Sequence, residues 1–148
     1  MSVRTPWATG SARFAIARRA DTGLLVTAVE CRIGAGHEKY SALLDTGAQW
    51  SVIGGDLARH MAPGAAGPTL RMATRQGLIL GTLERVSLHL LAEPGCGTDL
   101  LVDATILLAP EWQGPIVLGM RGLLERVRFE LDPDQTGADC WWSFGTGR

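Results

Sequence analysis

The sequence predicts an all-β domain built from short strands and tight turns. Nineteen glycines and seven prolines interrupt the 148 residues, and the apolar runs between them are too short for long helices. At positions 85–90, apolar side chains alternate with polar ones, which is the two-residue period of a half-buried strand. No linker or repeat divides the chain, so we expect one domain over residues 1–148.

Three strands are predicted in the first half of the chain, each centred on a short apolar run. They lie at residues 14–17, 24–29 and 40–44. Asp21, Thr22 and Gly23 supply the turn of a hairpin between the first two, because Asp and Gly tolerate the left-handed backbone of tight turns. Residues 56–61 are expected to form a short helix that ends before Pro63.

The second half is predicted to continue as strands, with one further short helix. The strands lie at residues 78–80, 85–90, 100–108, 115–119, 127–131 and 140–144. The run at 115–119 is apolar enough for a strand buried on both faces. Residues 120–126, after Gly119, are the best helix candidate, and the aromatic run at 141–144 is interpreted as a final strand packed on the core.

Composition argues against several classes of function. Lys and Arg number 14 against 15 acidic residues, so no net field attracts nucleic acid or an anionic membrane. No apolar run reaches the roughly 20 residues of a membrane helix, and the N-terminus lacks a signal-peptide pattern. The three widely spaced cysteines are typical of free thiols in a reducing compartment. We therefore expect a cytoplasmic protein that binds neither nucleic acid nor a membrane.

No residue pattern indicates a metal or a cofactor. His37, His60 and His89 lack the neighbouring His or Cys ligands of a metal site. The glycine-rich turn at 34–36 opens no helix, so it does not match a phosphate-binding loop. The prediction is a site without metal or cofactor.

The most informative residue is Asp45, which follows an apolar stretch at the end of a predicted strand. A carboxylate in that place is partly removed from water and needs hydrogen bonds to hold it. Small residues after it, Gly47 and Ala48, let the backbone turn sharply and let a ligand approach closely. The Thr46 hydroxyl can both donate and accept a hydrogen bond, so it can fix the loop.

Residues 43–48, Leu-Leu-Asp-Thr-Gly-Ala, resemble the signature of retropepsin-like aspartic proteases. A second mark of that family, Ile-Val-Leu-Gly at 116–119, comes further along the chain and precedes the predicted short helix. The resemblance implies a closed β-barrel that forms half of an acid protease, with a flap hairpin and one short helix after Gly119. Asp-Thr-Gly-Ala-Gln at 45–49 is closer to cellular and bacterial single-lobe members, including the retroviral-protease-like domain of DNA-damage-inducible proteins.

The resemblance also implies roles for individual residues. Asp45 would be catalytic, with Thr46, Gly47 and Ala48 supporting the active-site loop. Residues 72–80 occupy the place of the flap. The residues that would contact an extended, apolar polypeptide substrate are Leu43, Met72, Thr74, Arg75, Gln76, Gly77, Leu78 and Val117.

One lobe with one catalytic aspartate implies a homodimer. The second Asp-Thr-Gly, at 21–23, follows no apolar strand and lies too close to Asp45 to belong to another lobe, so we interpret it as a turn. The second aspartate is then Asp45 of another chain, related by a two-fold axis. Residues 1–12 are expected to form an N-terminal arm and 133–148 a turn and aromatic end strand, segments that interleave across the dimer in retroviral relatives.

Two departures from the retroviral pattern stand out. The flap tip has a single glycine, Gly77, whereas retroviral flaps are glycine-rich. Gln49 and Trp50 replace acidic residues, so an inter-chain Arg–Asp contact of those relatives is not reproduced and Arg121 would need another partner. The predicted function is an aspartic endopeptidase. The alternative is a catalytically silent dimeric domain that uses the same fold to bind peptides or proteins.

Overall fold

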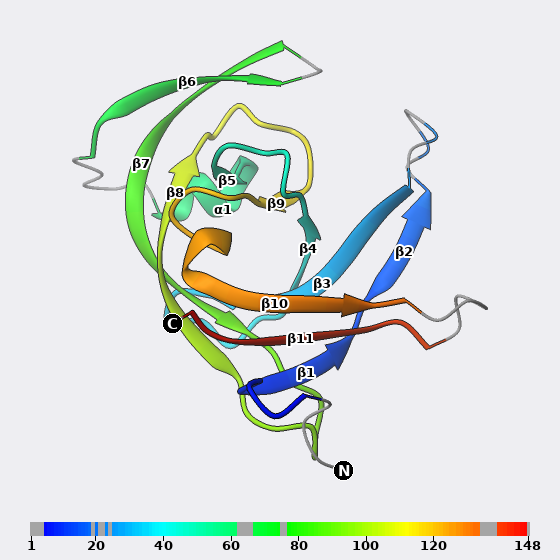
Figure 1. The fold of residues 1–148 in the computed structure, drawn as a ribbon. Coiled ribbons are helices and arrows are strands. Elements are labelled where there is room, and N and C mark those ends of the chain that lie inside the picture. The colour runs from blue at the N-terminus through cyan, green and yellow to red at the C-terminus, as the bar shows by residue number, and fades with distance from the viewer. Residues whose placement is uncertain are drawn as a thin grey trace.

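The structure is a computed structural model that describes residues 5–18, 20, 23, 25–61, 67–74, 77–133 and 139–147. Its strands form one sheet of eight and one of three (Figure 1). The elements are β1 (Gly10–Arg13), β2 (Ala15–Arg18), β3 (Leu25–Ile33), β4 (Tyr40–Leu44), β5 (Ser51–Ile53), α1 (Gly55–Met61), β6 (Thr69–Thr74), β7 (Gly77–Leu90), β8 (Leu100–Leu108), β9 (Ile116–Leu118), the 3-10 turn η1 (Leu124–Arg126), β10 (Val127–Asp132) and β11 (Trp141–Thr146).

Six strands of the larger sheet close a barrel. The strand order is β2-β3-β4-β9-β5-β8-β7-β6, and β3 also pairs with β7, so the ring returns to its starting strand. It closes where residues 31–33 of β3 lie antiparallel to residues 88–90 of β7. The predicted all-β fold with a closed barrel is confirmed.

The first predicted hairpin is also present, since β2 pairs antiparallel with β3. Its proposed turn residues Asp21 and Thr22 lie outside the described residues. The loop around Pro63 lies outside them as well. No helix in the described part of the chain is long and apolar enough to cross a membrane.

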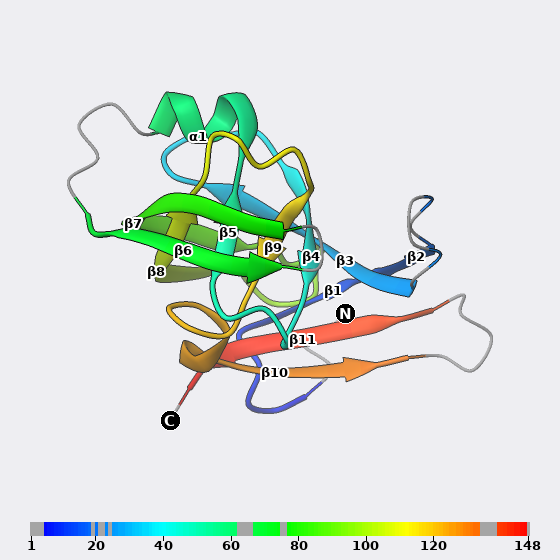
Figure 2. The same cartoon turned by 90° about the horizontal axis from the view of Figure 1, so that it is seen from above.

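Strands β6 and β7 form the hairpin expected at the flap position. Thr74 lies opposite Gly77, and the pairing continues back to Thr69 opposite Thr82. The predicted tip residues Arg75 and Gln76 lie outside the described residues. Figures 1 and 2 show the hairpin passing over β5 and β8. The two strands predicted at 78–80 and 85–90 are parts of one continuous strand, β7.

The outer face of β8 changes from exposed to buried where this hairpin covers it. From Leu100 to Ala104, buried and exposed side chains alternate, and from Ile106 to Leu108 all three are buried. Leu107 belongs to a small apolar cluster formed with Val52, Met72, Ile79 and Ala109, whereas Ile106 belongs to the main core inside the barrel. The hairpin therefore gives the barrel a second hydrophobic layer beside the predicted site.

The smaller sheet consists of β1, β11 and β10, with β11 in the middle. Trp142 and Phe144 of β11 are fully buried in the main core, and their ring centroids are 4.7 Å apart. The prediction of an aromatic end strand packed on the core is thereby confirmed. Both edges of β11 pair within its own chain, so β11 has no free edge to interleave with a second chain, contrary to the retroviral arrangement.

The segment predicted as the best helix candidate does not form an α-helix, whereas the other predicted helical segment does. The α-helix is α1, whereas only residues 124–126 of the segment 120–126 form a single 3-10 turn. Gly122 adopts a φ of 75°, which no α-helix contains. Its N–H donates to the Glu125 carboxylate at 2.8 Å, so a side chain replaces a helical carbonyl there.

The three cysteines are free and buried, and burial raises the pKa of the Cys31 thiol from 9.0 to about 12, with a smaller contribution from the neighbouring Glu30 carboxylate. At pH 8 the thiolate, which is the reactive form, should then be only about one in ten thousand of the Cys31 population. Iodoacetamide should therefore label Cys31 far more slowly in the folded chain than in the same chain in urea, as followed by mass spectrometry. Equal labelling rates in the two states would contradict this environment.

Candidate active site

The parallel pairing of β4 with β9 brings the two family-like segments together. Leu43 lies opposite Val117, and Leu44 lies opposite Leu118. The pairing extends one step beyond the strands, because the Asp45 N–H donates to the Leu118 carbonyl at 3.0 Å. Asp45 therefore leaves the sheet at a position set by backbone hydrogen bonds and not by its own side chain.

The turn after β4 holds the Asp45 carboxylate on the surface. The Gly47 N–H donates to Asp45 Oδ1 at 2.9 Å, and the Ala48 N–H donates to the Asp45 carbonyl at 3.1 Å. Asp45, Thr46 and Gly47 are exposed, whereas Ala48 is half-buried. No hydrogen bond of the Thr46 hydroxyl occurs within the described residues, so both the carboxylate and this hydroxyl are available to a ligand or a second chain.

The segment after β9 binds the far side of the same turn. The Met120 N–H donates to the Ala48 carbonyl at 2.9 Å, and the Arg121 N–H donates to the Gln49 carbonyl at 2.8 Å. The Gly119 N–H donates to the hydroxyl oxygen of Ser51 at 2.9 Å, and Ser51 is fully buried. Residues 45–51 are thus joined along their length to residues 118–121.

Arg121 has the alternative partner that the sequence left open. Its guanidinium carbon lies 4.9 Å from the centre of the Trp50 ring, and the two residues form an isolated parallel bridge. Trp50 thus offers the Arg121 charge an aromatic face, on which a planar guanidinium stacks well.

A strip of apolar side chains lies beside the turn, under the β6–β7 hairpin. Half-buried Val117, Trp50 and Trp112 pack against the cluster that contains Met72 and Ile79. Met72 and Val117, both predicted from the sequence to contact substrate, thus lie in the same apolar strip. Ile79 and Trp112 were not nominated from the sequence, although the two-residue strand period could have identified Ile79 as facing the same way as its cross-strand partner Met72.

Two predicted contact residues are placed differently from expectation. Leu78 is 72% exposed and lies on the face of the hairpin opposite to Ile79, so it points away from the apolar strip. Val117 is half-buried and not fully buried as a doubly covered strand would require, because it faces the strip at the edge of the barrel. At the hairpin end, the Thr74 hydroxyl donates to the Gly77 carbonyl at 2.8 Å.

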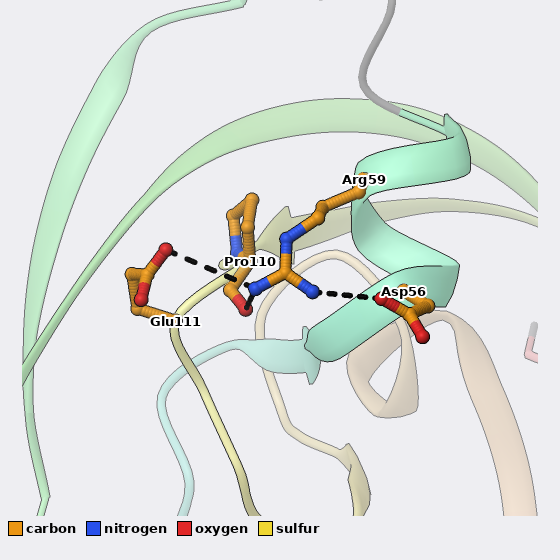
Figure 3. Close-up of polar contacts among 4 residues, drawn as sticks. All are labelled: Asp56, Arg59, Pro110 and Glu111. Carbon is orange, nitrogen blue, oxygen red and sulfur yellow. Dashed lines mark hydrogen bonds and ion pairs between the residues drawn. The ribbon is translucent and has the colours of Figure 1, made fainter.

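The segment that carries Trp112 is attached to α1. Arg59 donates to the Pro110 carbonyl at 3.2 Å and lies 2.8 Å from Asp56 and 3.9 Å from Glu111 (Figure 3). The Gly55 N–H donates to the same Pro110 carbonyl at 3.2 Å. These charges are largely exposed, so they orient the segment more than they stabilise the fold.

No three His, Cys, Asp or Glu side chains gather as a metal-binding group in the ranges that the structure describes. Two surface hollows lie away from the turn. One includes Met61 and His89, the other includes Lys39 and Glu93, and Asp45 lines neither of them. In a single chain, then, the Asp45 carboxylate lies on an open surface.

Comparison with one solved structure supports the fold. A crystal structure of edgp superposes with a TM-score of 0.58 at 12% identity over 98% of this chain and 48% of that one, so this chain spans about half of its length. A crystal structure of a retropepsin-like aspartic protease from Rickettsia conorii aligns at 17% identity with a TM-score of 0.44, covering 97% of this chain and 99% of that one. No protein-family model and no curated protein matches the sequence.

The close approach of Gly119 to the turn gives a direct test of this geometry. A methyl group added at Gly119 would lie 2.5 Å from both the carbonyl carbon and oxygen of Trp50, so the backbone would have to move. Gly119→Ala should lower the free energy of unfolding by about 1 to 3 kcal/mol in urea denaturation. The control is Gly36→Ala, where the nearest atom is 3.7 Å away and the change should stay within about 0.5 kcal/mol. Equal effects of the two substitutions would contradict the packing described.

Proposed function

We propose that this chain is a single-lobe relative of the retropepsin-like aspartic proteases and acts as an endopeptidase in a homodimer. The observation that carries the proposal is the exposed Asp45 carboxylate, oriented by the Gly47 N–H at the end of a strand pair. No described Lys, Arg or His forms an ion pair with it, so its open side is free to face a second carboxylate. The whole chain would act as one domain that supplies half of the site.

The second carboxylate must come from another chain, because Asp21 falls in the sequence between β2 and β3, which pair with each other, and so cannot supply a second lobe. A two-fold axis passing beside Asp45 would place the two carboxylates face to face. At a separation of ~3 Å, two negative charges would repel by about 5 kcal/mol at an effective dielectric constant of ~20. The pair would therefore hold one proton between them.

That shared proton supplies both an acid and a base for peptide hydrolysis. The ionised carboxylate removes a proton from a water molecule while the water oxygen bonds to the peptide carbonyl carbon. The protonated carboxyl donates its proton to the carbonyl oxygen, which gives a neutral tetrahedral diol. The first carboxyl then protonates the leaving nitrogen as the C–N bond breaks, and the second recovers a proton from the diol. The pair returns to its starting state, with no metal and no covalent enzyme intermediate required.

The residues around Asp45 suggest the other parts of the site. The free Thr46 hydroxyl would reach the partner's turn, and the backbone of Gly47 would contact the substrate main chain. An extended peptide would pass beneath the end of the β6–β7 hairpin, and its apolar side chains would pack on half-buried Leu43 and Val117, with buried Met72 behind them. Ile79 belongs to that buried layer and Leu78 does not, because Ile79 lies on the same face of the hairpin as Met72.

Asp45→Asn should abolish the activity. The purified chain is offered a diverse peptide pool from pH 3 to 8, and the products are identified by mass spectrometry. Asn has nearly the shape of Asp but cannot remove a proton from water, so the cleavage rate should fall by at least about 100-fold. Asp103→Asn is the matched control and should leave the rate unchanged, since Asp103 is an exposed carboxylate on β8, paired with Arg85, that belongs neither to the Asp45 turn nor to the apolar strip.

Cleavage that persists in the Asp45→Asn chain would sink this mechanism. Absence of cleavage by the unmodified chain, with a folded dimer in sedimentation, would favour the peptide-binding alternative instead.

A further inference from the structure

The contact between Arg121 and Trp50 lies at the end of the network that holds the Asp45 turn. The same Arg121 whose backbone N–H donates to the Gln49 carbonyl at 2.8 Å places its guanidinium over the Trp50 ring at 4.9 Å. The main chain and the side chain of Arg121 thus contact two successive residues of the turn, Gln49 and Trp50. No ion pair of Arg121 occurs within the described ranges. The observed partner of its guanidinium is the Trp50 ring.

Trp50 is constrained on its other sides as well. Its side chain is half-buried and packs against the apolar cluster under the β6–β7 hairpin. Its carbonyl group lies so close to Gly119 that a Cβ there would approach it to 2.5 Å. The ring therefore lies between a fixed apolar layer and a planar cation, and loss of either one would leave it free to move.

We propose that the stack of Arg121 on Trp50 positions Asp45 for catalysis, an inference that rests on the proposed peptidase function. Arg121 and Trp50 are positioning residues, because neither touches the reacting atoms in the proposed mechanism. The stack shields the bond from Arg121 to Gln49 and keeps the next bond, from Met120 to the Ala48 carbonyl, in register.

The effect reaches the carboxylate through a short chain of backbone contacts. Ala48 accepts from Met120 through its carbonyl and donates through its own N–H to the Asp45 carbonyl. The next N–H, that of Gly47, holds Asp45 Oδ1. A shift of Ala48 would therefore be passed to the carboxylate, and a catalytic group displaced by about 1 Å can lose as much as ~100-fold in rate.

The structure offers a matched control for this contact. Arg128 lies over Trp7 at 4.5 Å, which is an equivalent stack outside the proposed site. Arg121→Gln should lower kcat by about tenfold and change KM by less than about twofold, because the loss falls on positioning and not on substrate binding. Arg128→Gln should leave both constants unchanged, although it removes the same kind of contact.

Conservative substitutions separate positioning from a merely structural role. Trp50→Phe keeps an aromatic face and should retain most of the kcat, whereas Trp50→Leu should lower it about as much as Arg121→Gln. The double variant Trp50→Leu with Arg121→Gln should be no slower than either single one, because both remove the same contact. Three results would overturn the proposal. They are an unchanged kcat in Arg121→Gln, a rise in KM without a fall in kcat in that variant, and an equal fall of kcat in Arg128→Gln.

Amide hydrogen exchange makes the inference testable apart from the peptidase activity. In Arg121→Gln, the amides of Ala48 and Met120 should exchange several-fold faster than in the unmodified chain, and in Arg128→Gln they should not. If the unmodified chain cleaves no peptide, the proposed function is wrong. Hydrogen exchange would still test the stack in that case. Unchanged exchange at Ala48 and Met120 in Arg121→Gln would overturn the positioning role itself.

Discussion

The parallel pairing of β4 with β9 is the constraint on which the site depends. Two strands that run side by side in the same direction end at the same edge of a sheet, so the turns that follow them must meet. Here those turns are residues 45–51 and 118–121, joined first by the bond from Asp45 to Leu118. Strands β5, β7 and β8, which lie between them in the chain, complete the barrel around this junction together with β3.

A buried serine and a glycine make that junction tight. Ser51 accepts the Gly119 N–H inside the protein, where an unpaired N–H would cost more than the bond itself contributes. Gly119 in turn lets the Trp50 main chain approach without a side chain between them. The exposed carboxylate of Asp45 is thus carried on a turn that hydrogen bonds to residues 118–121 hold in place, as a group proposed to meet its symmetry mate requires.

Much of this was predictable from the sequence because its signals are local. An apolar run that ends in Asp and small residues predicts both the end of β4 and the turn after it. Strand β1, Gly-Ser-Ala-Arg, and the three-residue β5 carry no such signal, since their pairing depends on partners far along the chain. The absence of an α-helix over residues 120–126 depends on a positive φ at Gly122 that the sequence permits but does not require.

The face of a strand on which a side chain lies was harder to predict than the place of the strand in the sequence. Neighbouring residues of a strand face opposite sides, so Leu78 was predicted together with Met72 although Ile79 is the residue that lies beside Met72. The partner of Arg121 was unpredictable for a similar reason, because the stack on Trp50 follows from the meeting of two distant turns. Such contacts arise only when the barrel has closed.

The central claim is that each chain carries half of a site. Mixing the unmodified chain with Asp45→Asn chains at constant total concentration, with time for subunits to exchange, tests it most directly. If the site needs Asp45 from both chains, mixed dimers are inactive and activity falls with the square of the unmodified fraction, so an equal mixture retains about a quarter of it. Activity that falls in simple proportion, to about half in the equal mixture, would show that one carboxylate suffices and would contradict the account.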